Sequence, residues 1–196
     1  DIADITLPNP FPRMTYSESM DQYGSDHPDI RYDLKLQNVQ SFTDGSSFNA
    51  FKNVEDIFGI VIPGGAKYSR KNIDEFTKFV KPYKAKGLAW MKGEGGAMSG
   101  GISKFFSSNL QEKMRSKLSI NDGDILFMIG DTKKTAQTAL GALRCKIADI
   151  ENLINNNDFN PLWVTDFPMF EFDEEENRYH SLQHPFTQPK TDNIEN

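Results

Sequence analysis

The sequence predicts an α+β fold, and three observations support this prediction. Short apolar runs of the strand type alternate along the chain with stretches in which apolar residues recur at helical spacing. Pairs such as Asp44-Gly45 and Asp122-Gly123 separate several of these segments and are typical of turns. No internal repeat is visible. We therefore expect helices and strands that are mixed along the chain.

Length and composition indicate a globular protein. The 196 residues are enough to bury a core without disulfides, and 37% hydrophobic with 26% charged residues are ordinary values for soluble proteins. The longest apolar run, Ile57–Ile62, is far shorter than the ~20 residues of a membrane helix. The single cysteine, Cys145, excludes an internal disulfide framework and a four-cysteine zinc site, so we expect a cytoplasmic protein. The net charge of −6 gives no support for a globally basic, nucleic-acid-binding surface.

The first residues, Asp1-Ile2-Ala3-Asp4, do not form a signal peptide, because they lack a basic segment followed by an apolar one. They also lack an initiator methionine. We therefore expect the chain to be a piece of a longer protein, with a processed mature chain as the alternative.

The first helix is predicted by its two ends. Thr15-Tyr16-Ser17-Glu18 forms a capping box, in which the side chains of Thr15 and Glu18 each accept a hydrogen bond from the other residue's amide. The helix should run over Tyr16–Tyr23 and end at Gly24. After a polar loop, the alternation over Leu34–Leu36 predicts a strand.

The next segments are a strand, a helix and a strand. Ile57–Ile62 is predicted to be a buried strand that ends at Pro63-Gly64-Gly65. Leu88–Met91 is the next strand. Between them, a helix begins after Ser69 and ends near Pro82, whose nitrogen carries no hydrogen to donate. Its apolar face consists of Ile73, Phe76 and Val80.

The following third carries two more helices. Five glycines in the nine positions Gly93–Gly101 predict a flexible connection, and Ile102–Phe106 a short strand. Ser108–Gln111 has the pattern of a capping box and begins a helix. A strand over Ile125–Ile129 leads to Asp131, which should cap the longest helix, to about Ile150. The inner face of that helix has apolar residues at helical spacing: Ala136, Ala139, Leu140, Leu143 and Ile147.

An asparagine-rich segment over residues 152–160 interrupts this pattern. Two strands are predicted after it, Leu162–Phe172 and Arg178–Leu182, joined by the acidic run Asp173–Glu176. The composition shifts at both ends of the chain. This suggests a central domain bracketed by two segments of another unit.

Two glycine-containing loops invite a phosphate-binding interpretation. Gly93–Gly96 lacks the Gly-Lys-Ser/Thr ending of a phosphate loop and does not lie between a strand and a helix N-terminus, so a hairpin loop is preferred. Pro63-Gly64-Gly65 precedes a helix but is better explained as a turn that needs a positive φ.

The remaining polar candidates also lack the spacing of an active site. The four acids of Asp173–Glu176 should splay into water rather than converge on a metal. Asp166 and Glu171 are an odd number of residues apart on one predicted strand, so they should face opposite ways. Cys145 has no evident base beside it. The three histidines have no metal-ligand spacing: His27, His180 and His184.

Several motifs, in order along nearly the whole chain, resemble the bacterial-type aspartyl-tRNA synthetases. The most specific are Pro161–Glu171 and Gln183–Thr187 near the C-terminus. Phe11–Tyr16 and Tyr23–Asp29 near the N-terminus match as well. The interior contributes three more: Pro63–Ala66, Lys86–Trp90 and Gly141–Arg144.

The resemblance implies a GAD-like insertion domain, an antiparallel sheet with helices, flanked by segments of a class II synthetase antiparallel sheet. Residues 36–157 correspond to the insertion. Residues 1–35 and 158–196 correspond to the flanking catalytic-domain segments. These boundaries agree with the shift in composition at both ends.

The resemblance also implies a reaction. The family activates L-aspartate with ATP and Mg²⁺ and transfers it to the 3′ end of tRNA, and the full-length enzyme is expected to be a homodimer. The family's arginine-bearing motifs fall outside this stretch. We therefore expect no catalytic residue, metal ligand or bound cofactor in this piece, and no activity from it alone.

One pair of residues carries over to a substrate pocket. The family has two consecutive histidines before Pro-Phe-Thr, placed over the aspartate and adenylate. Here His184 matches the second histidine, and Gln183 replaces the first, a departure from the family pattern. The Gln183 amide can donate and accept hydrogen bonds but cannot titrate near neutral pH as imidazole does. The alternative for His184 is an imidazole at a strand end, bonded to a backbone carbonyl.

A second function stays open, a non-catalytic GAD-type interaction module of the tRNA-dependent amidotransferase system. Such a module should lack the strands around Asp166–Phe170 and His184–Phe186, whose presence favours the synthetase.

Overall fold

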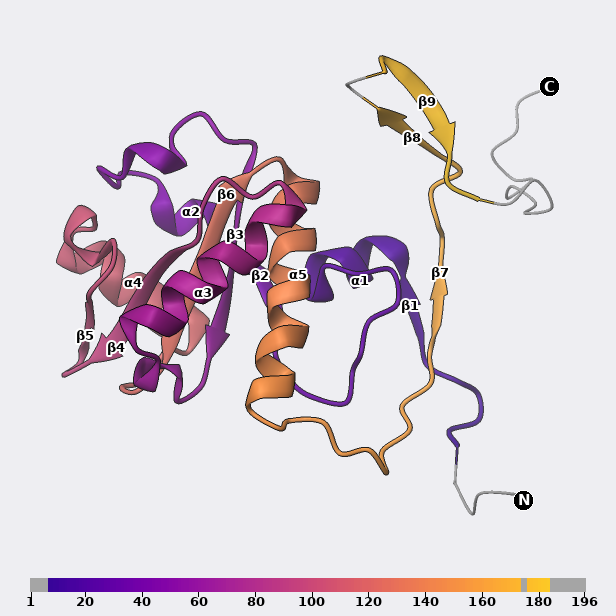
Figure 1. Ribbon diagram of the computed structural model, residues 1–196, viewed down its shortest axis with the longest axis horizontal. Coiled ribbons are helices and arrows are strands. Elements are labelled where there is room, and N and C mark those ends of the chain that lie inside the picture. The colour runs from indigo at the N-terminus through magenta and orange to yellow at the C-terminus, as the bar shows by residue number, and fades with distance from the viewer. Residues whose placement is uncertain (1–6, 174–175, 184–196) are drawn as a thin grey trace.

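The computed structural model describes residues 7–173 and 176–183 (Figure 1). Its centre is a five-stranded sheet of strand order β2-β3-β6-β4-β5, in which every neighbouring pair is antiparallel. The strands of this sheet are β2 (Leu36–Asn38), β3 (Asp56–Ile62), β4 (Ala89–Glu94), β5 (Ala97–Ser99) and β6 (Ile125–Asp131).

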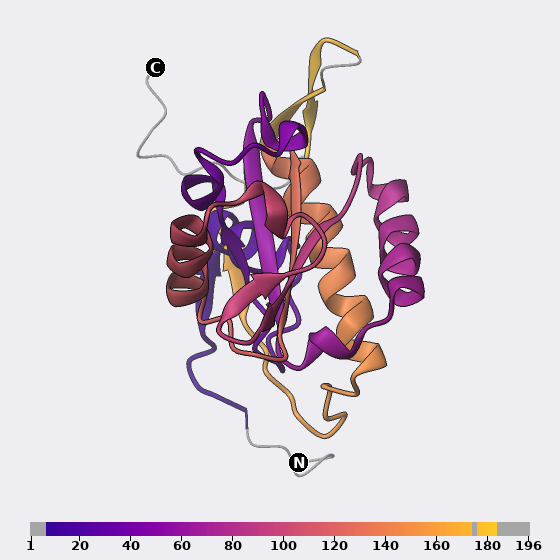
Figure 2. The ribbon, with the colours of Figure 1, turned by 90° about the vertical axis from the view of Figure 1, so that its left-hand side faces the viewer.

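Helices cover both faces of this sheet, as Figure 2 shows in an edge-on view. One face carries α3 (Arg70–Val80) and α5 (Lys133–Ile150), and the other carries α2 (Gln40–Thr43) and α4 (Ser108–Leu118). The central strand β6 is apolar on both sides, as this sandwich requires. Phe127 packs toward α3, where it meets Phe76, and Met128 packs on the α4 side.

The chain ends form two smaller ladders outside this sheet. β1 (Arg13–Thr15) pairs in parallel with β7 (Trp163–Thr165), so segments from opposite ends of the chain lie side by side. β8 (Phe170–Asp173) and β9 (Arg178–Ser181) form an antiparallel hairpin. The helix α1 (Tyr16–Tyr23) follows β1 and packs on α5 (Figure 1).

The predicted helix ends of α1 and α3 are confirmed. Thr15 and Glu18 form the expected capping box, and Gly24 ends α1 in the left-handed conformation with φ of 66°. Ser69 is the N-cap of α3, and the helix ends at Val80, just before Pro82. The α+β class with an antiparallel sheet is therefore the observed one.

Two predicted strands are displaced or absent. The strand predicted over Leu34–Leu36 corresponds to β2, but β2 begins only at Leu36. The Leu34 carbonyl is not part of the sheet, because it accepts a hydrogen bond from the buried Arg144 guanidinium. The strand predicted over Ile102–Phe106 is wrong. Gly100 and Gly101 both have positive φ and turn the chain, so that Ser103–Phe105 forms a 3₁₀ helix.

Two predicted caps are each one residue off. Ser107, rather than Ser108, caps α4, and the side-chain amide of Gln111 donates to the carbonyls of Ser103 and Phe106 instead of closing a capping box. Thr132, rather than Asp131, caps α5, because Asp131 is still paired as the last residue of β6.

The strand predicted over Leu162–Phe172 is two strands, β7 and β8. Asp166 follows β7 with a φ of 61°, a left-handed conformation that ends the strand. Asp166 and Glu171 therefore do not share a strand, so their odd spacing does not decide which way each side chain faces. Gly93, Gly95 and Gly96 lie in the β4–β5 hairpin, as the preferred interpretation predicts, and Gly100 and Gly101 follow β5.

Candidate functional site

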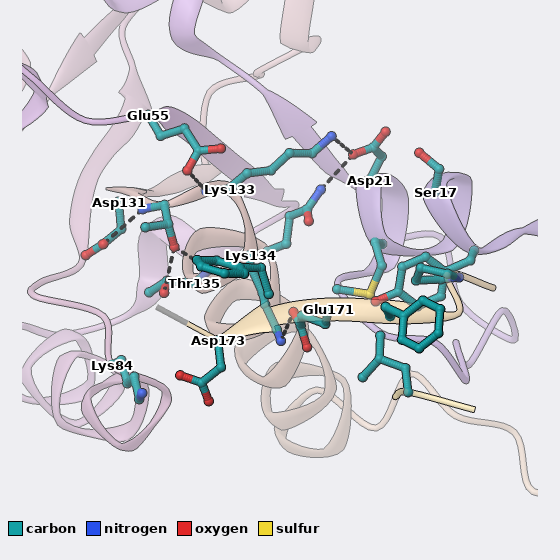
Figure 3. Close-up of a pocket in the computed structure, with 18 of the residues that line it drawn as sticks. Ser17, Asp21, Glu55, Lys84, Asp131, Lys133, Lys134, Thr135, Glu171 and Asp173 are labelled. Atoms are coloured by element: carbon teal, nitrogen blue, oxygen red, sulfur yellow. Dashed lines mark hydrogen bonds and ion pairs between the residues drawn. The ribbon is translucent and has the colours of Figure 1, made fainter. Parts of the chain in front are cut away.

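A large cleft lies where α5 meets the segments from the two ends of the chain (Figure 3). Its volume is about 1010 Å³, and its walls come from α1, from the N-terminal end of α5 and from the β8–β9 hairpin. Clefts between separate elements are typical places for binding sites.

Two consecutive lysines of α5 hold the walls of this cleft together. The Lys133 ammonium lies 2.8 Å from the Asp21 carboxylate of α1, and Lys134 pairs with Glu171 of β8 (Figure 3). The Gln137 amide one turn later donates to Asp21 at 2.6 Å. The first turns of α5 thereby contact both the N-terminal and the C-terminal segment.

The N-terminus of α5 already has acceptors for its amides. The Thr132 amide donates to Asp131 at 2.9 Å, and the Lys133 amide donates to Glu55 at 3.3 Å. The Thr135 amide donates to the Thr132 hydroxyl at 3.2 Å. Because these donors are occupied by the chain itself, this helix end is not arranged to hold a phosphate.

The charged groups of the cleft are mostly paired with one another. Asp131 is buried, and its carboxylate lies 3.7 Å from the Lys86 ammonium. Burial, and then the negative charge of Glu171, raise the pKa of the Tyr16 hydroxyl above its ordinary value. Within residues 7–173 and 176–183, no group of three or more His, Cys, Asp or Glu side chains is placed to hold a metal ion. The ion pairs of this cleft join α1 and β8 to α5.

Of the two predicted pocket residues, the structure describes one. Gln183 lies two residues after the end of β9, is half-buried, and accepts from the Ser181 hydroxyl through its backbone carbonyl at 2.8 Å. Its neighbour Leu182 lines the cleft. His184 lies outside the described residues, so its assignment stays a prediction.

The glycine loops use their amides within the chain. The Gly96 amide donates to both carboxylate oxygens of Asp122 at 3.1 Å, and the Gly64 amide donates to Asp124 at 2.9 Å. Carboxylates in these positions repel a phosphate. Both loops therefore behave as turns, as the sequence predicts.

The other candidates lie apart from one another. His27 is fully exposed at the end of its side chain, 3.6 Å from Asp26. His180 lies within its own hairpin, 3.3 Å from Glu176. The Cys145 sulfur accepts from the Tyr32 hydroxyl at 3.6 Å. Part of the acidic run Asp173–Glu176 lies outside the described residues.

Arg144 is a key residue that the sequence analysis missed. Its side chain is 1% exposed, and its guanidinium donates to the carbonyls of Leu34, Tyr32 and Asp29. It also donates to the Tyr32 hydroxyl at 2.8 Å and lies 4.0 Å from the centre of that ring. One residue of α5 thus donates hydrogen bonds to three backbone carbonyls of the irregular segment that follows α1. The signal in the sequence was its position four residues after Leu140, which places Arg144 on the buried face of the helix.

No helix among the described residues has both the length and the apolar character needed to cross a bilayer.

Comparisons with known proteins give a consistent result. Residues 48–140 match the GAD domain family. The chain is 44% identical over 99% of its length to the aspartate–tRNA(Asp/Asn) ligase of Brachyspira hyodysenteriae, covering 34% of that protein. It is 43% identical over 100% of its length to the aspartate–tRNA ligase of Staphylococcus saprophyticus, covering 34% of it, and 45% identical over 97% to that of Streptococcus thermophilus, covering 32%. The chain spans about a third of the length of these relatives.

Proposed function

We propose that the chain is part of an ATP-dependent ligase that attaches L-aspartate to the 3′ end of tRNA. The chain carries a GAD domain and is related along its whole length to bacterial aspartate–tRNA ligases. The observation that carries this proposal is the extent of the match. The GAD family match stops at residues 48 and 140, whereas the identity of 43–45% with the ligases includes both flanks.

The proposed reaction has two steps. Aspartate attacks the α-phosphate of ATP to give aspartyl-adenylate and pyrophosphate, and the aspartyl group then passes to the terminal adenosine of tRNA. Mg²⁺, when bound, would stabilise charge on the phosphates. The described residues offer no cluster suited to a metal ion, so we assign no Mg²⁺ ligand to them.

The flanks, residues 1–35 and 158–196, are proposed to be strips of the class II catalytic sheet, with residues 36–157 as the inserted domain. The parallel pairing of β1 with β7 supports this division, because it joins the two flanks to each other. The pair is parallel, whereas the resemblance predicts an antiparallel sheet. The β8–β9 hairpin is antiparallel as expected.

Gln183 and His184 are proposed to line the aspartate and adenylate pocket of the full-length enzyme. Gln183 lies at the end of the hairpin that α5 contacts through Lys134 and Glu171. A neutral amide there can donate to a substrate carboxylate and accept from an ammonium group. We further propose a cytoplasmic homodimer, and no activity of residues 1–196 alone.

The test is aspartate-dependent kinetics in the full-length enzyme. His184→Ala should raise the aspartate KM or slow adenylate formation. His27→Ala is the matched control, because its imidazole is 91% exposed and distant in sequence, and it should leave both constants unchanged. Unchanged kinetics in His184→Ala would remove the pocket assignment without affecting the ligase proposal, which the wild-type activity tests.

A further inference from the structure

A groove separate from the cleft lies at the end of the central sheet where β3 begins and β6 ends. Its volume is about 590 Å³. One wall is residues 48–54, which follow α2, and the other is residues 86–90, which include the start of β4. Met128 and Gly130 of β6 form its floor. We propose that this groove binds an acidic peptide segment of a partner protein, anchored by an apolar side chain.

The interior of the groove is apolar. Phe51 and Val54 pack over Gly130. A Cβ at this position would lie 2.9 Å from the Phe51 ring, so the absence of a side chain at Gly130 leaves room for them. Both are partly exposed, as are Phe48 and Trp90 nearby. A pocket of this size with partly exposed aromatic walls accommodates one or two apolar side chains of a ligand.

The charge of the groove is opposite to that of the chain. The whole sequence has 28 acidic and 22 basic residues, yet the groove is lined by Lys52, Arg70 and Lys86 and by no carboxylate. The Arg70 guanidinium lies 3.9 Å from Asp74, and the Lys86 ammonium lies 3.7 Å from Asp131. Both are ion pairs made by largely exposed cations, with side chains 77% and 83% exposed, and Lys52 has no ion pair among the described residues. An anionic ligand would complement these cations.

The environment of Trp90 favours a peptide over a nucleic acid. A stacked base needs a free ring face. The backbone of Gly100 and Gly101 packs on this indole, since a Cβ on either would lie 2.8–2.9 Å from ring atoms. The Arg70 and Lys92 cations lie 5.9 Å and 5.7 Å from the ring centre. A base would have to displace these groups, whereas acidic side chains can pair with the cations as they stand.

The experiment selects phage-displayed random dodecapeptides on this chain and counter-selects on the double variant Lys52→Glu/Lys86→Glu. The expected peptides carry Asp or Glu around an aromatic residue or Leu. The chain has two tryptophans, so Trp163→Phe leaves Trp90 as the reporter of binding. A selected peptide should change the Trp90 emission saturably. In the double variant, the affinity for the peptide should be weaker by about tenfold or more.

The matched control is Lys71→Glu/Lys78→Glu, which reverses two exposed charges on α3 outside the groove and should leave peptide affinity unchanged. Circular dichroism of each variant checks the fold. The proposal is overturned if no peptide is enriched, if enriched peptides lack acidic residues, if both double variants weaken binding equally, or if a single-stranded RNA oligomer binds more tightly at Trp90 than the peptides. The proposal does not depend on the ligase activity.

Discussion

Gly24 and Gly141 bring the backbones of α1 and α5 into direct contact. A Cβ at Gly141 would lie 2.6 Å from the Tyr23 carbonyl oxygen and 2.7 Å from that of Gly24. Gln137 and Lys133 of α5 also bind Asp21 of α1, which opposes a separation of the two backbones. The two glycines therefore set how closely α1 packs on α5.

Gly141→Ala should destabilise the chain by about 1–3 kcal/mol through this overlap. The sign is informative, because an alanine in a helix interior is otherwise about 1 kcal/mol more favourable than glycine. Gly87→Ala is the control, since nothing lies within 4 Å of a Cβ there and φ is not positive. Urea unfolding measures both; a Gly141→Ala chain as stable as wild type would show that the contact is loose.

Substitution of Arg144 is expected to lower the free energy of unfolding more than substitution of an exposed arginine does. Arg144→Lys keeps the charge but cannot reach the carbonyls of Asp29, Tyr32 and Leu34 together. Leaving a buried acceptor without a donor costs about 1–3 kcal/mol, so the loss should exceed about 2 kcal/mol in chemical unfolding. Arg70→Lys, at a site where the side chain is 77% exposed, should stay within about 0.5 kcal/mol. Equal effects would contradict the role of Arg144.

The ion pair of Glu151 predicts a loss of stability in acid. The Lys67 ammonium, 2.5 Å away, and then the Tyr68 hydroxyl, at 2.6 Å, hold the pKa of this carboxyl below its ordinary value of 4.5. A lowered folded pKa stabilises the chain above the unfolded pKa, and this contribution is lost as the pH falls through the folded one. The difference in unfolding free energy between wild type and Glu151→Gln should therefore shrink below about pH 4.5. A difference that is constant with pH would refute the pairing.

The cap of α4 gives a test with adjacent serines. Ser107→Ala removes the hydroxyl that accepts from the Leu110 amide and should cost about 1 kcal/mol. Ser108→Ala changes the first residue inside the helix and should stay within about 0.5 kcal/mol. Thermal unfolding of the two variants compares them directly, and the reverse order would place the cap at Ser108.

Local signals were sufficient for most of the fold. The box of Thr15 and Glu18 and the apolar stripe of α5 depend on residues within one element, and both predictions are confirmed. The predicted N-cap of α4 was one residue off because Ser107 and Ser108 have the same side chain and can both cap a helix. Only the tertiary contacts of Gln111 distinguish them.

Long-range packing could not be predicted in this way. Nothing in the surroundings of Gly24 in the sequence indicates that it meets Gly141, and nothing indicates that Arg144 binds residues 29–34. The cleft depends on the same kind of contact, since α1, α5 and β8 are far apart in sequence. The pocket assignment of Gln183 and His184 came from resemblance alone and stays a prediction.

The most direct test of the account is ATP–pyrophosphate exchange with each amino acid in turn, using the full-length protein and the 196-residue chain side by side. The account predicts exchange that requires L-aspartate in the full-length protein, and none above background with the chain alone. Exchange that depends on another amino acid, or aspartate-dependent exchange by the chain by itself, would contradict it.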